Sequence, residues 1–371
     1  MAILRFSRIL LSGFLILVLC SCTDGGYYLQ AAKGQYNILK NRQPIEKLLV
    51  SGKLDEQQQL ELSRILKMRN FASEQLALPD NGSYRSFVAL ESSYPLWNVV
   101  AAPELSLEPK TWCFPIAGCV SYRGYFSESE ATEFALALQK SNFDTLVTGV
   151  PAYSTLSWFD DPVLSSFSSW PASSVARLIF HELAHQQLYL PGDSAFSEAF
   201  ATSVELAGSK LWLTTYGTEQ ETELFHRKLK REETFIDWTN SLHHQLAEIY
   251  AGPSSINEKR RLKSELFDEA QRSYLSLKEA WGGYSGYDHW VETINNARLV
   301  SLRTYRKLLP AFDALLAEHN YDFTAFYSAC KDLAAQPTEL RQQLLAKLKK
   351  NQQLAAQTSS SYRRTSPGVQ E

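Results

Sequence analysis

Residues 180–186 read FHELAHQ and combine an apolar helical pattern, which begins near Pro171, with the motif H-E-x-x-H. On a helix, His181 and His185 lie on one face, one turn apart. This spacing lets two imidazole nitrogens reach one tetrahedral Zn²⁺ at about 2.0–2.1 Å. Glu182 then projects beside the ion, where it can take a proton from water and deliver it to a leaving amine. The segment predicts a helix with His181 and His185 as zinc ligands and Glu182 as the catalytic base.

The motif is not decisive by itself. Seven His and 40 acidic residues among 371 give about 0.014 chance matches per chain. The alternative is a helix with two structural His residues. The sequence that follows favours the metal site, because Pro191 and Gly192 can end the helix and Asp193 or Ser194 can cap a second one.

A third ligand is expected on this second helix. Glu198 follows His185 by 13 residues, and the short turn would bring it back towards the His pair. Two His and one Glu leave an open position for water, as in catalytic zinc sites. Glu205 lies two turns later on the same face and is the second choice for the ligand. Otherwise it is a hydrogen-bond partner of a ligand or a surface charge.

The pattern before the motif changes from helix to strand. Apolar residues recur at helical spacing within 27–80, which predicts helices there. Residues 83–126 are rich in strand formers and are expected to form a small sheet. A helix over 127–140, capped by Ser127 or Ser129, and a segment of strand and loop over 143–162 are expected to follow.

The pattern from Ser169 to about residue 350 is almost wholly helical, with interruptions at Gly282-Gly283 and Pro310. These patterns predict an α+β, mostly helical fold, with a small mixed sheet before the motif helix and a helical C-terminal half. We expect residues 22–350 to form one unit, in which 22–168 hold the sheet and 169–350 hold the zinc site. The tail 351–371 is expected to be disordered.

The composition excludes several classes of protein. The chain is 44% hydrophobic and 12% aromatic, which is too apolar for a mainly disordered protein. A net charge of -3 does not suggest nucleic acid as the main partner. The mean hydropathy of -0.25 excludes a polytopic membrane protein. A globular enzyme of one large domain or two smaller ones fits these values.

The N-terminus has the pattern of a secretory signal peptide over residues 1–21. Arg5 and Arg8 precede an apolar segment, and residues 19–22 read LCSC, which resembles a bacterial lipobox with Cys22 as the lipidated residue. An ordinary signal peptide or a buried hydrophobic strand is the alternative. Thr23 replaces the Asp that would retain the protein in the inner membrane. We therefore expect a lipid anchor on Cys22 that holds the chain on the outer membrane, facing the periplasm.

Three cysteines remain after Cys22. Cys113 and Cys119 flank a turn and can pair in an oxidising compartment, and two buried thiols are an equally weighted alternative. Cys330 makes the number odd. The absence of C-x-x-C argues against thioredoxin-like redox chemistry and against a zinc ribbon.

Residues 180–186 together with 196–205, which read FSEAFATSVE, resemble the gluzincin metalloproteases. These carry H-E-x-x-H and then an N-E-x-F-A-like helix whose Glu binds zinc; here Ser197 stands where Asn is common, and the gap between the motifs is shorter. The chain is more closely similar to the zinc aminopeptidases of Gram-negative bacteria, which are often lipoproteins. That resemblance covers about 27–333 and is carried by residues 112–115, 122–126, 152–156, 159–162 and 295–299.

The resemblance implies a gluzincin-like core, Zn²⁺ as cofactor and a peptide substrate. Carried over by position, it makes His181, His185 and Glu198 the zinc ligands and Glu182 the catalytic base. The G-x-M-E-N stretch with which large aminopeptidases hold the substrate amine is missing. An endopeptidase, a hydrolase of cell-wall peptides and a non-catalytic envelope lipoprotein therefore stay as alternatives to an aminopeptidase.

A Tyr or His is expected to assist in stabilising the oxyanion. Tyr305 is the first choice, and His289, Tyr284 and Tyr287 are weaker candidates.

In gluzincins the substrate pairs with an edge strand before the active-site helix, and residues 119–126 or 146–156 could supply one. The sequence leaves open whether Asp160 and Asp161 form a turn or contact the site. It also leaves open whether the aromatic residues of this region bind substrate or form core: Trp112, Tyr122, Tyr125, Tyr153 and Trp158.

Overall fold

The computed structural model describes residues 25–114, 118–156, 158–302 and 308–350. It is mostly helical with small sheets, in agreement with the expected α+β class. The predicted signal peptide, Cys22, Tyr305 and the tail 351–371 lie outside the described residues. The division into a single unit over 22–350 stays a prediction.

The N-terminal part contains a helix over 25–40, α2 (Ile45–Leu49) and α3 (Glu56–Glu74). The predicted helical segment is thus broken into three helices. The start of α3 is fixed by a capping box, in which the Asp55 carboxylate accepts from the backbone N–H of Gln58 and the Gln58 side chain accepts from the backbone N–H of Asp55. The buried face of α3 packs on the motif helix and the helix that follows it.

The strand-forming residues are divided among three small sheets, where the sequence predicted one. The first is mixed, because β2 (Ser86–Val88) pairs antiparallel with β1 (Gln43–Pro44) and parallel with β8 (Val163–Leu164). The second is antiparallel, with β3 (Leu96–Pro103) between β6 (Arg123–Tyr125) and β7 (Phe143–Val150). β3 and β7 pair over eight residues, whereas β1, β2, β6 and β8 are each only two or three residues long.

The third sheet is a hairpin closed by a disulfide. β4 (Trp112–Phe114) pairs with β5 (Gly118–Val120), and Cys113 stands directly opposite Cys119. The two cysteines form a disulfide, so the prediction of a bridge is confirmed and the alternative of two buried thiols is wrong. Cys330 is free and buried.

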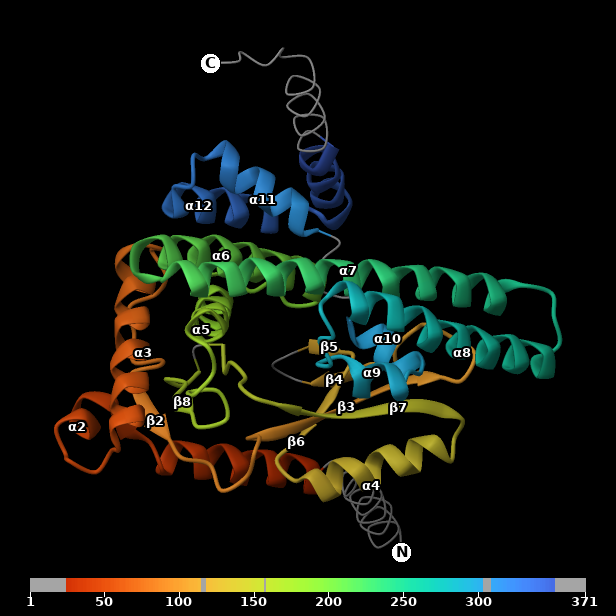
Figure 1. The fold of residues 1–371 in the computed structure, drawn as a ribbon, viewed down its shortest axis with the longest axis horizontal. Helices are drawn as coiled ribbons and strands as arrows, with labels where there is room; N and C mark the ends of the chain where they lie inside the picture. Colours follow the sequence, from red (N-terminus) through yellow and green to blue (C-terminus); the bar gives the residue numbers. More distant parts are fainter. Residues whose placement is uncertain (1–24, 115–117, 157, 303–307, 351–371) are drawn as a thin grey trace, which may run out of the picture.

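Helices cover both sides of the antiparallel sheet. α4 (Glu128–Gln139) lies beneath it and α10 (Asn296–Leu302) packs on β3 and β7 (Figure 1). The hydroxyl of Ser127 accepts from the backbone N–H of Glu130 and caps α4, as predicted. Asn296 ties α10 to the sheet, since its side-chain amide donates to the carbonyls of Pro103, Glu104 and Ser106.

The motif helix α5 (Ala172–Gln187) begins after Pro171, and α6 (Ser194–Tyr216) follows a turn that contains Pro191 and Gly192. Asp193 caps α6 by accepting from the backbone N–H of Phe196. The two helices pack closely along their lengths. Gly208 permits this approach, because a Cβ there would stand 2.5 Å from a Leu76 methyl group and 3.0 Å from the Phe180 ring.

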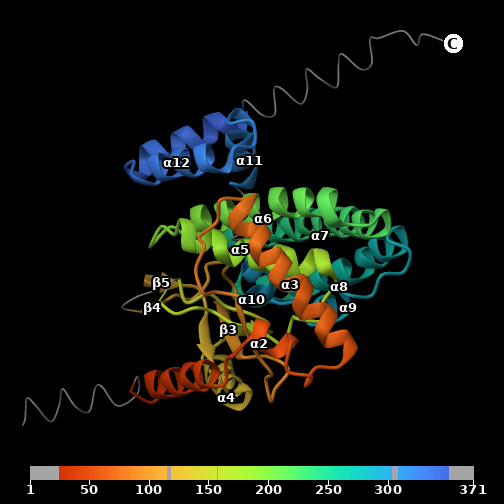
Figure 2. The same cartoon turned by 90° about the vertical axis from the view of Figure 1, so that its left-hand side faces the viewer.

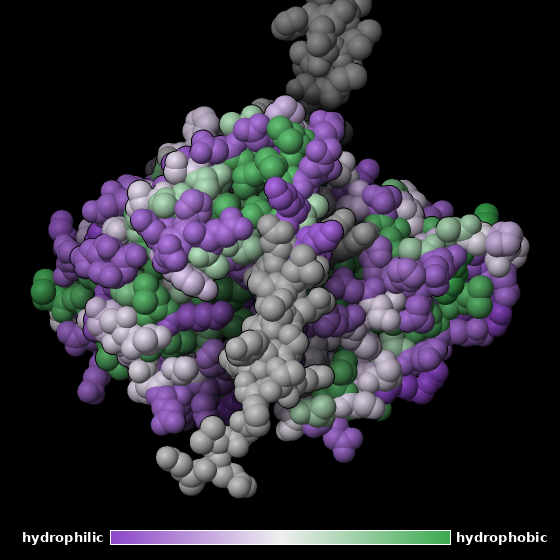
Figure 3. Space-filling model, turned by 90° about the horizontal axis from the view of Figure 1, so that it is seen from above, coloured by the Kyte–Doolittle hydropathy of each residue, from purple (hydrophilic) through white to green (hydrophobic). Residues whose placement is uncertain are grey.

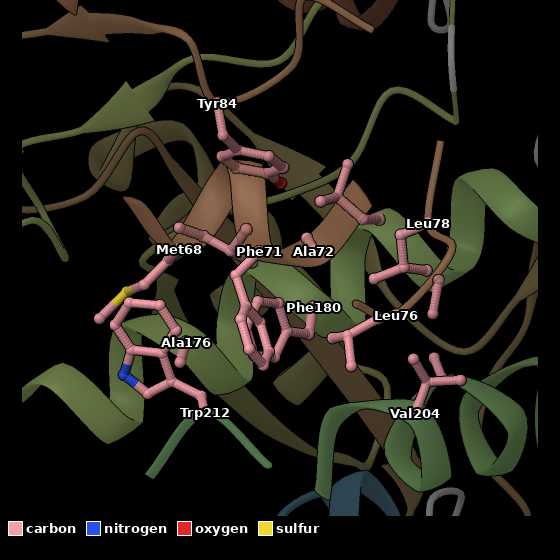
Figure 4. Packing of buried hydrophobic residues seen from close by; sticks show 14 of the residues in the cluster. Met68, Phe71, Ala72, Leu76, Leu78, Tyr84, Ala176, Phe180, Val204 and Trp212 are labelled. Carbon is pink, nitrogen blue, oxygen red and sulfur yellow. The ribbon is translucent and has the colours of Figure 1, made fainter. Parts of the chain in front are cut away.

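The largest apolar core surrounds α5. It joins α3, α5 and α6 with residues from the C-terminal helices, and its members include Phe71, Phe180, Val204 and Trp212 (Figure 4). A second core lies between β3, β7 and the long helices α7 (Glu219–Ala251) and α8 (Ile256–Ala280). The helix that carries the motif is therefore held by packing on all of its apolar positions.

The C-terminal half is helical, as predicted. α7 and α8 form a long hairpin beside α6, and α11 and α12 pack above α6 (Figures 1 and 2). The bounds are α7 Glu219–Ala251, α8 Ile256–Ala280, α9 Asp288–Glu292, α11 Leu309–Glu318, α12 Phe323–Ala334 and a last helix over 338–350.

The upper surface mixes hydrophilic and apolar residues (Figure 3). A groove of about 390 Å³ lies there between α11, α12 and the helix 338–350. The predicted metal ligands are not among the residues that line it. No helix among the described residues is long and apolar enough to cross a membrane.

Candidate metal centre

Three predicted ligands converge where α5 meets α6. The ligand atoms of His181, His185 and Glu198 all lie within 4.8 Å of one another. The two His residues stand one turn apart on α5, and Glu198 lies in the second turn of α6. The Asp193 cap and the short turn before it place Glu198 opposite the His pair. The structure thus brings together the three residues that the sequence singled out.

The donor atoms face a common point. The Nε2 atoms of His181 and His185 are 3.1 Å apart. The Glu198 carboxylate oxygens lie 3.3 Å from Nε2 of His181 and 3.7 Å from Nε2 of His185. Two nitrogens bound at about 2.0–2.1 Å to one tetrahedral ion would be separated by about 3.3 Å. Two imidazoles and one carboxylate at these separations fit a zinc ion with one ligand position left open.

Glu205 supports His181 from the opposite edge of the ring. Nδ1 of His181 donates to the Glu205 carboxylate at 3.0 Å. Arg177 donates to the other Glu205 oxygen and pairs with Glu232 of α7, at 2.9 and 3.2 Å. Glu205 does not belong to the cluster of ligand atoms. Of the alternatives that the sequence left open, the geometry favours a hydrogen-bond partner of a ligand over a third ligand.

This hydrogen bond fixes the tautomer of His181. When Nδ1 carries the proton that Glu205 accepts, the lone pair of the neutral ring is on Nε2, which faces the cluster. His185 lacks such support, because its Nδ1 is buried and has no hydrogen-bond partner among the described residues. The two His residues are therefore held differently, because His181 has a carboxylate partner and His185 is buried beside the Tyr189 ring.

The cluster is rich in negative charge. Burial acts to raise the pKa of Glu198, but hydrogen bonds from His181 and His185 outweigh it and lower that pKa to about 2. Burial acts to lower the pKa of His181, but the carboxylates of Glu198 and Glu205 raise it well above its usual range. Metal ligation requires neutral imidazoles, and the nearby carboxylates of Glu182 and Glu198 would then have no protonated His to offset their charge. A divalent cation would supply the missing positive charge.

Glu182 lies beside the ligands and is partly buried. Burial raises the pKa of its carboxyl group, and the nearby His181 and His185 oppose that rise. None of the described residues forms a hydrogen bond or an ion pair with this carboxylate. Glu182 is thus close to the cluster but not committed to any structural contact, which leaves both oxygens free for a proton transfer.

Two tyrosines border the cluster. Tyr189, just after α5, places its ring centroid 6.0 Å from that of His185. Tyr122, between β5 and β6, is 41% exposed, and burial of its hydroxyl raises its pKa to about 12 with contributions from Glu198, Tyr189 and Glu182. The carboxylates of Glu198 and Glu182 are thus near enough to act on the Tyr122 hydroxyl, although the residue is partly exposed. Tyr122 was expected only as an aromatic residue of the substrate site or the core, not as the residue that assists at the oxyanion.

The other candidates in that half lie elsewhere. His289 is exposed on α9 and contacts Arg298, Tyr284 contacts Arg231, and Tyr287 stacks on Phe235. None of them contacts the ligand cluster. The place of Tyr305 lies outside the described residues, so its role stays a prediction.

The structure distinguishes between the two candidate edge strands. β6 and β7 are both edges of the antiparallel sheet, but Tyr122 lies directly before β6. Segment 119–126 is thus the one that borders the cluster. Most of 151–162 has no regular secondary structure, so the expected strand over 146–156 ends at Val150. Of the aromatic residues, Tyr125 is buried in the core and Trp158 is 65% exposed.

A second loop borders Glu182 from the N-terminal half. The Gln186 side chain accepts from Asn81 at 2.8 Å and donates to Ser83 Oγ at 3.2 Å. The backbone N–H of Tyr84 donates to the carbonyl of Asp161. Asp161 is 3% exposed, accepts from both the backbone and the hydroxyl of Thr155, and forms a turn rather than a ligand. No sequence pattern pointed to Tyr84, because nothing local relates it to a helix about 100 residues later.

The comparisons with known proteins agree with a peptidase. A family model described as "Putative aminopeptidase" matches residues 26–345, which include both helices of the cluster. No curated protein matches the chain. No solved structure matches it.

Proposed function

Since this chain belongs to the putative aminopeptidase family, we propose that it is a zinc-dependent peptide hydrolase that acts as an aminopeptidase. The observation that carries this proposal is the cluster of His181, His185 and Glu198, whose ligand atoms lie within 4.8 Å of one another beside Glu182. These three residues would hold the ion. When bound, Zn²⁺ would polarise the peptide carbonyl and lower the pKa of water.

Glu182 is the proposed general base. Its carboxylate takes a proton from the attacking water as the new C–O bond forms, and it gives that proton to the amine as the C–N bond breaks. The raised pKa of its carboxyl group and its lack of structural partners suit both transfers. The proposed role of Glu205 is structural: with Arg177 and Glu232 behind it, it holds His181 in the orientation that metal ligation requires.

The substrate is proposed to bind along β6. An edge strand offers backbone groups to which an extended peptide can add as a further strand. Tyr122 and Tyr189 would then contact the peptide near the bond to be cleaved, because both border the cluster. A donor such as the Tyr122 hydroxyl can stabilise the oxyanion.

Exopeptidase action rests on the family, since the sequence lacks the G-x-M-E-N stretch with which large aminopeptidases hold the substrate amine. An endopeptidase or a hydrolase of cell-wall peptides uses the same zinc chemistry and is the second candidate. The cellular location is also proposed from the sequence alone: a lipid anchor on Cys22 would hold the enzyme at the outer membrane, facing the periplasm.

Turnover by the Glu182→Gln variant tests the mechanism. Amino-acyl anilides with a free amine and their N-acetylated counterparts are assayed side by side with the zinc-loaded enzyme. We expect the variant to keep its zinc and its fold and to lose turnover by roughly 10²-fold or more. Glu248→Gln is the matched control, because Glu248 is exposed on α7, where it pairs with the exposed His244. A Glu182→Gln enzyme with full activity contradicts the mechanism, and equal rates on blocked substrates favour the endopeptidase.

A further inference from the structure

Tyr84 combines two unfavourable features. Its backbone is in the left-handed region, with φ of 61°, which is rare for a bulky side chain. The residue is also 1% exposed, and its hydroxyl has no hydrogen-bond partner among the described residues. An unusual backbone conformation and an unpaired buried hydroxyl are each destabilising. Their coincidence in one residue calls for a role other than stability.

Several independent contacts hold Tyr84 in this conformation. The backbone N–H of Tyr84 donates to Asp161, at 2.6 Å, and the preceding carbonyl of Ser83 accepts from buried Arg69 at 2.8 Å. The Ser83 hydroxyl accepts from Gln186. Figure 4 shows the Tyr84 ring at one edge of the apolar side chains around Phe71 and Phe180. The ring is therefore clamped from the backbone side and from the core side.

The clamp places Tyr84 on the Glu182 face of α5. Gln186, to which the loop is bonded, follows Glu182 by four residues and so lies on the same face, one turn away. Burial raises the pKa of the Tyr84 hydroxyl well above its usual range, and Glu182 adds to that rise more than any other charge. Glu182 thus has the strongest charge effect on this hydroxyl.

The two groups are complementary. The Tyr84 hydroxyl is a donor without an acceptor, and the Glu182 carboxylate is an acceptor to which no described residue donates. We infer that Tyr84 is a positioning residue for Glu182, whose carboxylate receives a hydrogen bond from the Tyr84 hydroxyl during turnover. The bond would fix the orientation of the carboxylate towards the attacking water and leave its second oxygen for the proton. This inference rests on the proposed function.

Tyr84→Phe tests it because the change removes only the hydroxyl. We expect kcat to fall roughly tenfold or more while KM stays within twofold, with one zinc per chain retained. We also expect Tm to stay equal or to rise, because the lost hydroxyl has no partner in the resting protein. A merely structural tyrosine would show the opposite pattern, a lower Tm and an unchanged kcat.

Tyr327→Phe is the matched control. Tyr327 is also buried in the same apolar core, but its hydroxyl donates to the carbonyl of Leu76 at 2.7 Å. The Tyr327→Phe variant should have a lower Tm and an unchanged kcat. If the wild type is active and Tyr84→Phe is equally active, the inference about Tyr84 is wrong but the proposed function still stands. The same holds if Tyr84→Phe has both a lower Tm and a lower activity. A zinc-loaded wild type that hydrolyses no peptide of either series overturns the proposed function and this inference with it.

Discussion

Nδ1 of His181 lies 3.0 Å from a carboxylate oxygen of Glu205, on the side of the ring opposite to the ligand cluster. This contact separates the two acidic residues of α6 by role. Glu198 approaches the Nε2 atoms of both His residues, whereas Glu205 approaches only the outer nitrogen of His181. Because Arg177 and Glu232 hold Glu205 in turn, the orientation of His181 depends on residues of three helices.

Glu205→Gln is therefore expected to weaken metal binding without abolishing it. Loss of a carboxylate behind a ligating His costs about 10–100-fold in metal affinity. The variant should still reach one zinc per chain when zinc is in excess. Competition with a chromophoric chelator measures the affinity, and Glu232→Gln, one contact further out, should have a smaller effect. An affinity equal to that of the wild type would remove Glu205 from the support of His181.

Asp161→Asn should change how stability depends on pH. Burial raises the pKa of Asp161 to about 6, although hydrogen bonds from Thr155 oppose the rise. The folded protein therefore binds this proton more tightly than the unfolded chain does. The stabilisation is complete below about pH 4 and is lost as the pH rises through 6. Asparagine does not titrate, so the variant should not show this loss.

Urea unfolding between pH 4 and pH 7 measures the effect. The free energy of unfolding of Asp161→Asn, relative to the wild type, should increase by up to about 3 kcal/mol over this range. Asp237→Asn is the control, because Asp237 is exposed on α7 and its curve should parallel that of the wild type. Parallel curves for Asp161→Asn and the wild type would contradict the burial of a titrating carboxyl group at this position.

Asp193→Ala should destabilise the start of α6. One carboxylate oxygen accepts from the backbone N–H of Phe196 at 3.0 Å, and the other accepts from Arg341, which is 6% exposed, at 2.9 Å. Loss of the cap alone costs about 1 kcal/mol, and the unpaired Arg341 adds to it. Asp193→Asn keeps the cap and loses the charge, so its Tm should fall between those of Asp193→Ala and the wild type. If both variants have the same Tm as the wild type, Asp193 does not stabilise the start of α6.

The convergence of His181, His185 and Glu198 could be predicted from the sequence because the geometry of the motif is local. His181 and His185 are one helical turn apart in any α-helix, and the break at Pro191 and Gly192 determined that Glu198 would come back towards them. The roles of Glu198 and Glu205 could not be separated, since both lie on one face of α6. Glu198 and Glu205 approach different nitrogens of His181, and which nitrogen each approaches depends on how closely α5 and α6 pack. Gly208 is one residue that permits this close packing.

The residues around the motif could not be predicted, because tertiary packing places them. Tyr84 and Tyr122 come from loops that precede α5 by 50 residues or more. No sequence pattern singled out Tyr84, and for Tyr122 the choice between substrate binding and the core stayed open. The strand formers of 83–126 were recognised. Their division among three sheets was not, because strands of two or three residues are defined by their partners and not by their own pattern.

Zinc content of the purified protein without residues 1–22 tests the central claim most directly. Elemental analysis should find about one zinc per chain in the wild type and in Glu182→Gln, and a loss of zinc in His181→Ala and Glu198→Ala. No zinc after reconstitution would contradict a metal site at His181, His185 and Glu198. Zinc that is lost in Glu205→Ala but kept in Glu198→Ala would contradict the assignment of the third ligand.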